Sequence, residues 1–347
     1  MMKKILAAAI VSAFAAPAFA ATANVDVYGK LHMSVNVFDD QPAAVNDVGI
    51  SSNASRIGFK GAEDLGGGLK AIWQLEQTVV LDEGSGNFAT RNSFIGLNGG
   101  FGTALIGRHD TPLKLVGRAV DLFGDTMADS RNVMSGGSDT RANNVAVYMT
   151  PNMGGFGIAA AYSTDLGAGT TIAPSTTSAD TDNRGVYNLN ATYKNGPLFL
   201  GLGYGDGDGH EALGLGAHMR AAAGFTMGSF KLVGQYDKLD DDNATSGQAG
   251  DFDAWMVGGA FTMGNVVLKA NYMEGEYDGD LATAGFDTEQ WTVGADYNLS
   301  KRTTVYALYA QGENITMGRG AGTSDQVGSG VAGGDISILS LGMTHTF

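Results

Sequence analysis

The sequence predicts an all-β protein, a 16-stranded antiparallel β-barrel that spans a membrane, and three observations support this prediction. Apolar and polar residues alternate with a period of two in segment after segment, each about ten residues long. Beyond the first twenty residues, no apolar run approaches the ~20 residues that a transmembrane helix needs. The connections alternate between short turns and long polar stretches, which is typical of a barrel with turns at one end and loops at the other.

The first segment, residues 1–20, has the order of a secretory signal peptide. Lys3 and Lys4 form a positively charged start, Ile5 to Phe14 form an apolar stretch, and Ala18-Phe19-Ala20 forms a small-residue cleavage site. We therefore expect this segment to be removed and residues 21–347 to form one barrel domain in an exported protein.

The alternation also indicates which face of each strand meets water. In Asn24 to Phe38 the apolar set faces one way, and the polar set, which includes Asp26, Lys30 and His32, faces the other. A charged side chain facing lipid at mid-bilayer would cost roughly 2–4 kcal/mol, so the polar faces must line a water-filled interior. The same pattern recurs in Leu69 to Glu76, Tyr187 to Lys194, Phe230 to Asp237 and Gln290 to Asn298.

Two segments do not fit a strict period of two. If Arg91 and Arg141 both point inward, Ile95 and Val147 point inward as well. Either a β-bulge lies in each segment, or one of the two arginines is assigned to the wrong face.

Composition excludes several function classes. The chain has 21 basic and 36 acidic residues, a net charge of −15, which argues against nucleic-acid partners. It has no cysteine, so an exported protein of this sequence must be stable without disulfides. Its five histidines are too scattered for a metal motif, and no cofactor is expected. Acidic runs such as Asp240-Asp241-Asp242 are interpreted as a solvated surface, with Ca²⁺ or Mg²⁺ bridging to lipopolysaccharide as the alternative.

Several different short motifs follow one another along the chain in a specific order. They are VYGK at 27–30, SRIGFKG at 55–61, EDLG at 63–66, RNSFIGL at 91–97, Gly107-Arg108, SKRT at 300–303 and the terminal Phe347. In this order and spacing, the chain resembles the general porins of Gram-negative outer membranes along nearly all of its length after the signal peptide.

The resemblance implies a homotrimer in the outer membrane whose third extracellular loop, residues 109–140, folds into the lumen. In the family, acids on this loop face a basic wall, and the terminal aromatic is a signal to the barrel-assembly machinery, here Phe347. The matching wall residues are Lys30, Arg56, Arg91 and Arg141, and the matching loop acids are Asp121 and Asp125, with Arg108, Arg118, Asp110 and Asp129 as further members. Lys114, Arg118 and Arg131 give the loop a mixed charge.

The implied function is passive diffusion of small hydrophilic solutes and ions, without enzymatic activity. Opposed rows of charge across a narrow gap favour solutes that can orient their dipoles in the field. We predict a weak anion preference because the inward positions are rich in bases, namely Lys30, Arg56, Lys70, Lys194, Arg220, Lys231 and Lys269. Two alternatives remain: surface binding by the acidic loops, and an outer-membrane hydrolase that uses the inward-facing His32 and His218.

Overall fold

A computed structural model describes residues 24–39, 48–82, 88–134, 138–165, 185–206, 216–240, 251–278, 287–318, 327–328 and 334–347. The expected signal peptide lies outside the described residues. No helix among those described is long and apolar enough to cross a membrane.

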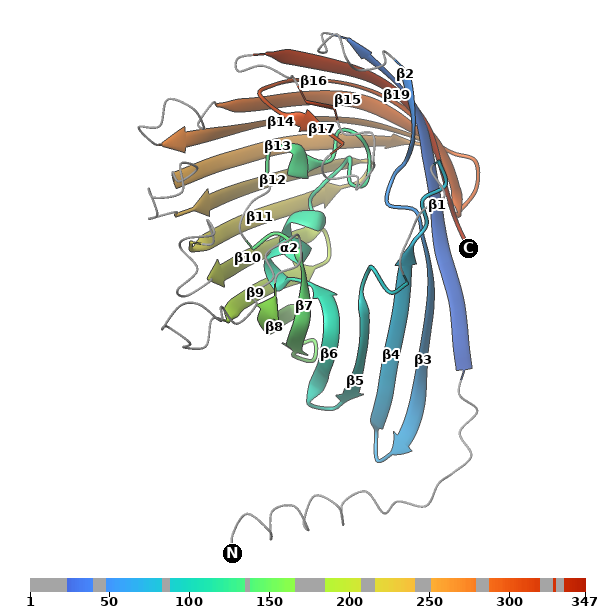
Figure 1. Ribbon diagram of the computed structural model, residues 1–347, viewed down its shortest axis with the longest axis vertical. Helices are drawn as coiled ribbons and strands as arrows, with labels where there is room; N and C mark the ends of the chain where they lie inside the picture. Colours follow the sequence, from blue (N-terminus) through green and yellow to red (C-terminus); the bar gives the residue numbers. More distant parts are fainter. Residues whose placement is uncertain are drawn as a thin grey trace, which may run out of the picture.

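One antiparallel sheet closes on itself through its first and last strands, β1 (Asn24–Asp39) and β19 (Asp335–Thr346), which pair from Lys30 to Asp39 (Figure 1). Each remaining strand of this sheet pairs with its neighbours in the chain, except that β2 and β3 both pair with β1 and that β16 pairs with β19. These strands are β2 (Val48–Ser52), β3 (Arg56–Gly66), β4 (Leu69–Thr78), β5 (Ser93–Gly99), β6 (Gly102–Asp110), β7 (Arg141–Met149), β8 (Phe156–Asp165), β9 (Val186–Asn195), β10 (Leu198–Asp206), β11 (His218–Met227), β12 (Phe230–Leu239), β13 (Asp251–Met263), β14 (Val266–Asp278), β15 (Thr288–Asn298) and β16 (Thr303–Glu313).

Strands β2 and β3 together form one strand of the barrel. Both pair with β1, β2 opposite Met33 to Val37 and β3 opposite Asn24 to Lys30. The interruption between them contains Ala54, whose φ of 51° is left-handed. Counted in this way, the 17 strands of the sheet make the predicted 16-stranded barrel, which is confirmed.

The two faces of β1 differ as the alternation predicts. Val27 is 55% exposed on the outer face, whereas Asn36 is fully buried on the inner face. Asn36 Nδ2 donates to Ser51 Oγ at 2.7 Å, and its Oδ1 accepts from Ser340 Oγ at 2.7 Å. This inner amide therefore joins β1 to both of its neighbours where the barrel closes.

The first irregular segment needs no bulge. Strand β5 begins at Ser93, so Arg91 lies before the strand and its direction is independent of the strand's alternation. Ile95 and Leu97 are exposed on the outer face. The conflict in the sequence came from starting the strand two residues too early.

The second irregular segment does contain an irregularity. The register between β6 and β7 shifts between Gly107 and His109, and Asn144 on β7 has a φ of 46°. Val147 is buried, as a strict alternation predicts. Arg141, at the start of β7, lies on the other side of the shift from Val147. The alternation in the rest of β7 therefore does not determine the direction of the Arg141 side chain.

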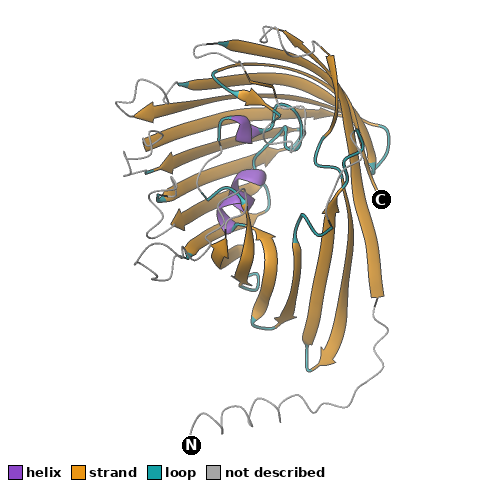
Figure 2. Ribbon diagram, viewed as in Figure 1, coloured by secondary structure: helices purple, strands orange, loops and turns teal. Residues whose placement is uncertain are grey.

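The described residues of the connection from β6 to β7, 111–134 and 138–140, lie inside the barrel and carry two short helices, α2 (Pro112–Arg118) and η1 (Ser130–Asn132) (Figure 2). We call it the inner loop; the prediction began it at His109, but His109 and Asp110 belong to β6. Its apolar side chains join a buried cluster with inner-face residues of the barrel, among them Val116, Phe123 and Met127 of the loop and Val233, Met256 and Met273 of the wall. Under the loop, the inner face is therefore dry.

Candidate functional site

Glycines on β10 give the inner loop its position against the wall. A Cβ at Gly203 would lie 3.1 Å from the Leu113 Cα of α2, and a Cβ at Gly205 would lie 2.2 Å from Ser138 Oγ. A strand glycine often marks a place where another backbone approaches closely. The alternating glycines of β10 thus form a groove that receives the start of the loop and its return.

Amide side chains on β9 hold the start of α2. Asn188 Oδ1 accepts a hydrogen bond from Leu113 N at 2.7 Å, and Asn190 Nδ2 donates to Pro112 O at 2.8 Å. Thr111 caps the helix, with its side chain accepting from Lys114 N. Backbone groups that the short helix leaves unpaired are therefore satisfied by the wall.

Asp125 brings the middle of the inner loop to the barrel wall. Its carboxylate lies 3.1 Å from Lys30 Nζ and 3.3 Å from Arg56 Nη1, both on the wall, and 2.6 Å from Arg118 Nη2 on α2. Burial alone would raise the pKa of Asp125, but Arg118, Lys30 and Arg56 hold it well below its ordinary value. The carboxylate is therefore charged at neutral pH and shared by three cations.

A second cluster lies at the start of the inner loop. Asp110 Oδ1 is 3.1 Å from Arg141 Nη2 and 3.3 Å from Lys114 Nζ. Asn92 Nδ2 donates to the other carboxylate oxygen at 3.2 Å, and Arg141 Nε donates to Asn92 Oδ1 at 2.7 Å. Asp110 therefore pairs with one wall cation and one loop cation.

Arg91 forms a separate pair with an acid of the wall. Its Nε lies 2.6 Å from Glu76 Oε1, and Tyr28 donates to Glu76 Oε2 at 2.9 Å. Glu76 was not among the predicted site residues, although its position one strand from Arg91 makes it a natural partner. The four predicted wall bases thus pair with three acids. Lys30 and Arg56 share Asp125, Arg141 pairs with Asp110, and Arg91 pairs with Glu76.

Two of the predicted loop acids bond within the inner loop. Asp121 accepts from Phe123 N at 2.9 Å and from Ser130 Oγ at 3.0 Å. Asp129 pairs with Arg131 at 3.1 Å and accepts from Asp125 N at 2.7 Å. Burial, followed by the nearby Asp129 carboxylate, raises the pKa of Asp121 to about 6. These hydrogen bonds and the Asp129–Arg131 ion pair lie within the inner loop and shape its path.

Arg108 lies on β6 at the register shift between β6 and β7. Its Nε donates to Thr90 O at 3.0 Å, and its Nη1 donates to Asn143 Oδ1. These contacts join Arg108 to the segment before β5 and to β7, and its place in the constriction stays a prediction.

Several charged residues that hold the inner loop were not predicted as site residues. Arg220 on β11 was expected to line the lumen, but it is buried between Asp139 of the loop and Asp237 of β12. Lys269 was also expected to line the lumen, and it pairs with Asp296 at 2.9 Å. Positions Arg220 and Asp237 face each other directly in the register of β11 and β12, but only the register reveals this.

The described part of the connection after β16 also reaches the inner loop. Its short strands β17 (Thr316–Met317) and β18 (Val327–Gly328) pair with each other. Met317 is fully buried in the cluster that contains Met127, and Gly318 N donates to Met127 O at 3.0 Å. Apart from the apolar character of these residues, no sequence pattern predicts this contact.

The structure does not bring the two inward histidines together. His32 on β1 bonds through Nε2 to Tyr306 OH at 2.8 Å, and His218 on β11 bonds to Asp237 at 3.3 Å. In the part of the chain that the structure describes, no three His, Cys, Asp or Glu side chains are grouped to hold a metal ion. The acidic run at 240–242 lies mostly outside the described residues.

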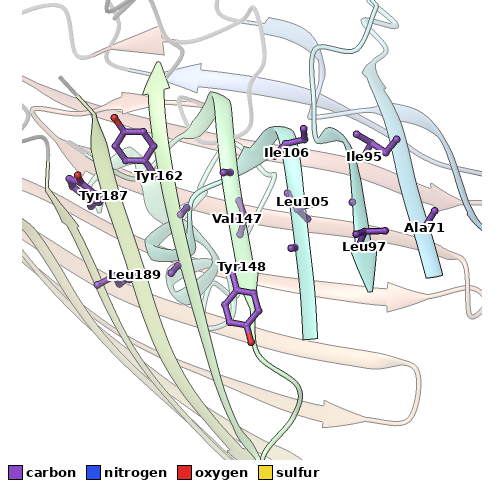
Figure 3. A pocket seen from close by; sticks show the side chains of 15 residues that line it. Ala71, Ile95, Leu97, Leu105, Ile106, Val147, Tyr148, Tyr162, Tyr187 and Leu189 are labelled. Atoms are coloured by element: carbon purple, nitrogen blue, oxygen red, sulfur yellow. The ribbon is translucent and has the colours of Figure 1, made fainter. Parts of the chain in front are cut away.

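The outer face of the barrel is apolar over β4 to β9. Figure 3 shows a recess over β4 to β9 whose lining includes Ile95, Leu97, Ile106, Tyr148 and Leu189. The side chains of these residues are exposed. A surface of this kind suits the hydrocarbon region of a membrane and not water.

Known proteins are similar to this chain in sequence and in fold. The chain is 34% identical over 217 residues to outer membrane porin protein 32 of Delftia acidovorans, an alignment that covers 58% of this chain and 59% of that protein. It is 35% identical over 211 residues to major outer membrane protein P.IB of Neisseria meningitidis serogroup B, with 58% of each chain covered. These alignments therefore span less than two thirds of the relatives' lengths.

Solved structures match over more of the chain. An anion-selective porin from Comamonas acidovorans superimposes with a TM-score of 0.73 at 27% identity, covering 94% of this chain and all of that one. OmpF of Salmonella typhi has a TM-score of 0.69 at 16% identity, which shows the fold alone. A sequence profile described as Gram-negative porin matches residues 7–317. Together with the closed barrel, this match shows that the chain belongs to the Gram-negative porin family of outer-membrane proteins.

Proposed function

We propose that this protein is a passive diffusion channel for small hydrophilic solutes and ions, with a weak preference for anions set at the inner loop. The observation that carries the proposal is the excess of cations where the loop meets the wall. Lys30, Arg56 and Arg118 surround the single carboxylate of Asp125, which leaves two positive charges in excess.

The other charged groups of this region do not reverse that excess. Asp110 faces both Arg141 and Lys114, which leaves one further positive charge, and Arg91 is balanced by Glu76. Asp121 offsets one positive charge when it is ionised, and Asp139 and Asp237 together exceed the charge of Arg220 by one, so one positive charge still remains in excess. A channel selects by the charges next to the permeating ion, so the constriction outweighs the overall charge of −15.

The preference expected here rests on fewer residues than the sequence suggested. Arg220 and Lys269 are compensated by Asp237 and Asp296, so neither supports an anion preference. The expected anion preference therefore depends on Lys30, Arg56 and Arg118, which we call the constriction bases. The similarity to a porin described as anion-selective favours the same sign of selectivity.

We further propose that the protein assembles as a homotrimer in contact with lipopolysaccharide, and that Phe347 signals to the barrel-assembly machinery. Porins are typically trimeric. The recess over β4 to β9 supplies an apolar surface that a second copy or lipid can cover. Electrophoresis without heating, combined with chemical crosslinking of outer-membrane fractions, tests the trimer: a monomer under both conditions contradicts it.

Single-channel recording in a planar bilayer under a KCl gradient tests the function. We expect stepwise openings, commonly in groups of three, and a reversal potential with the sign of a preference for chloride. Protein that was heat-denatured before reconstitution is the control. A refolded barrel that never conducts contradicts the channel, and a potential of the opposite sign contradicts the role of the constriction bases.

A further inference from the structure

Arg220 is an arginine buried inside the barrel wall under the inner loop. It lies on the inner face of β11 with 2% of its surface exposed. On the wall it makes a bidentate contact with Asp237, with Nε 2.8 Å from Oδ1 and Nη2 2.5 Å from Oδ2. Gln235 Nε2 also donates to Asp237 Oδ1, at 3.0 Å. The guanidinium is therefore fixed in orientation before the loop is considered.

The remaining donors of Arg220 reach both limbs of the inner loop. Nη1 lies 3.4 Å from Leu113 O, at the start of the loop, and 2.5 Å from Asp139 Oδ2, at its end. Nη2 donates to Met134 O at 2.9 Å. Leu113 and Asp139 are far apart in the sequence, so one guanidinium ties the outgoing and the returning limb to the same point of the wall.

The fit around the guanidinium is close. A Cβ at Gly117 of α2 would lie 2.5 Å from Arg220 Nη1 and 3.1 Å from Gln235 Oε1. The helix thus passes directly over the arginine, and a larger residue at Gly117 would displace one of them. Lysine cannot replace these contacts, because a single ammonium lacks the planar array of donors that arginine presents.

We propose that Arg220 is a positioning residue that ties both limbs of the inner loop to the barrel wall and thereby fixes the width of the constriction. This inference rests on the proposed channel function. Arg220 itself is too buried to meet a permeating ion, so its effect passes through the loop. Because β11 and β12 also pair along ten residue positions, the barrel does not depend on this one side chain.

Three variants separate tethering from folding and from lumen charge. Asp139→Asn removes the charged loop partner and leaves Arg220 paired with Asp237. Arg220→Lys keeps the charge but loses the bidentate contact. Lys60→Met removes one positive charge from β3, where the ammonium lies 5.3 Å from the centroid of the Tyr28 ring. Heat-modifiable migration verifies that each barrel is folded.

We expect Asp139→Asn and Arg220→Lys to raise the open-channel current noise several-fold and to increase the mean conductance, whereas Lys60→Met leaves the noise unchanged. Folded variants with the noise and conductance of the wild type overturn the proposal. Equal noise in Lys60→Met also overturns it, because lumen charge alone would then explain the effect.

A second measurement does not depend on conduction. Amide hydrogen exchange of the refolded barrel reports the opening of the loop directly. We expect Leu113 to Met134 to exchange at least several-fold faster in Asp139→Asn, while the β11 and β12 amides remain protected. If the wild type does not conduct, the proposed function fails but this test still decides the tether. Unchanged exchange across the loop overturns it.

Discussion

Asp125 shows how one residue organises the constriction. Its φ of 63° is left-handed, a conformation that costs a non-glycine residue energy unless the surroundings hold it. Asp129 accepts from its backbone N–H at 2.7 Å, and three cations bind its carboxylate. The turn at this residue therefore aims a carboxylate from the loop at the wall.

Replacing Asp125 with Asn should increase the anion preference. The substitution removes the negative charge that Lys30, Arg56 and Arg118 share, so these cations act on passing ions without compensation. A unit charge acts on an ion 4 Å away with roughly 1 kcal/mol in water, which corresponds to a several-fold change in relative permeability. The reversal potential under a KCl gradient measures this change.

Asp121→Asn is the matched control. It removes the same charge from the same loop, but Asp121 takes its hydrogen bonds from Phe123 and Ser130 inside the loop. We expect a smaller shift in selectivity than for Asp125→Asn. An equal shift in both variants would mean that the overall charge of the loop, and not the contact with the wall, sets the selectivity.

The sequence could not distinguish Asp121 from Asp125. Both are acids in the same long connection, and the family resemblance assigned them one role. The backbone path decides between them, since a turn at Asp121 directs its carboxylate to the N–H of Phe123. Lys30 and Arg56 were easier to predict because regular strands fix their direction.

At the level of elements, alternation predicted the strands but not what covers them. A period of two shows which residues share a face, as in β1 and β12, and this was enough to predict the barrel. It does not show that the inner loop lies against that face. The inner positions of Met256 and Met273 are therefore dry, although the lumen as a whole was expected to be wet. The same limitation concealed the partners of Arg220.

The glycine groove of β10 can be tested with one methyl group. A Cβ at Gly205 would lie 2.3 Å from the Cβ of Ser138, which is too close for either atom to remain in place. In Gly205→Ala we expect the returning limb of the loop to move away from the wall into the lumen, so the single-channel conductance falls. Crowding of this kind typically costs about 1–3 kcal/mol, which a barrel of this size tolerates.

Gly234→Ala provides the comparison on β12. The nearest atom to its added Cβ is Met256 O at 3.6 Å, an ordinary contact. We expect wild-type conductance and wild-type thermal stability from this variant. A drop in conductance equal to that of Gly205→Ala would indicate a general effect of losing strand glycines and would contradict the groove.

For the whole molecule, closure of the barrel brings Phe347 against the first strand, β1. Phe347 N donates to Gly29 O at 3.1 Å, and Gly29 N donates to Phe347 O at 3.1 Å. A Cβ at Gly29 would lie 2.3 Å from the Phe347 ring, so the ring rests on the glycine. The terminal residue therefore has a structural contact in addition to its proposed role as an assembly signal.

Phe347→Ala separates these two roles, because it keeps the backbone hydrogen bonds to Gly29 and removes only the ring. If the aromatic is a signal, purified protein refolds in detergent with nearly wild-type yield, while the amount of heat-modifiable barrel in the outer-membrane fraction of cells falls severalfold. Phe230→Ala, an exposed aromatic at the start of β12, controls for the loss of a surface ring. An equal loss in the refolding yield and in cells would mean that the ring acts by packing on Gly29, because a signal has no receptor to meet in detergent.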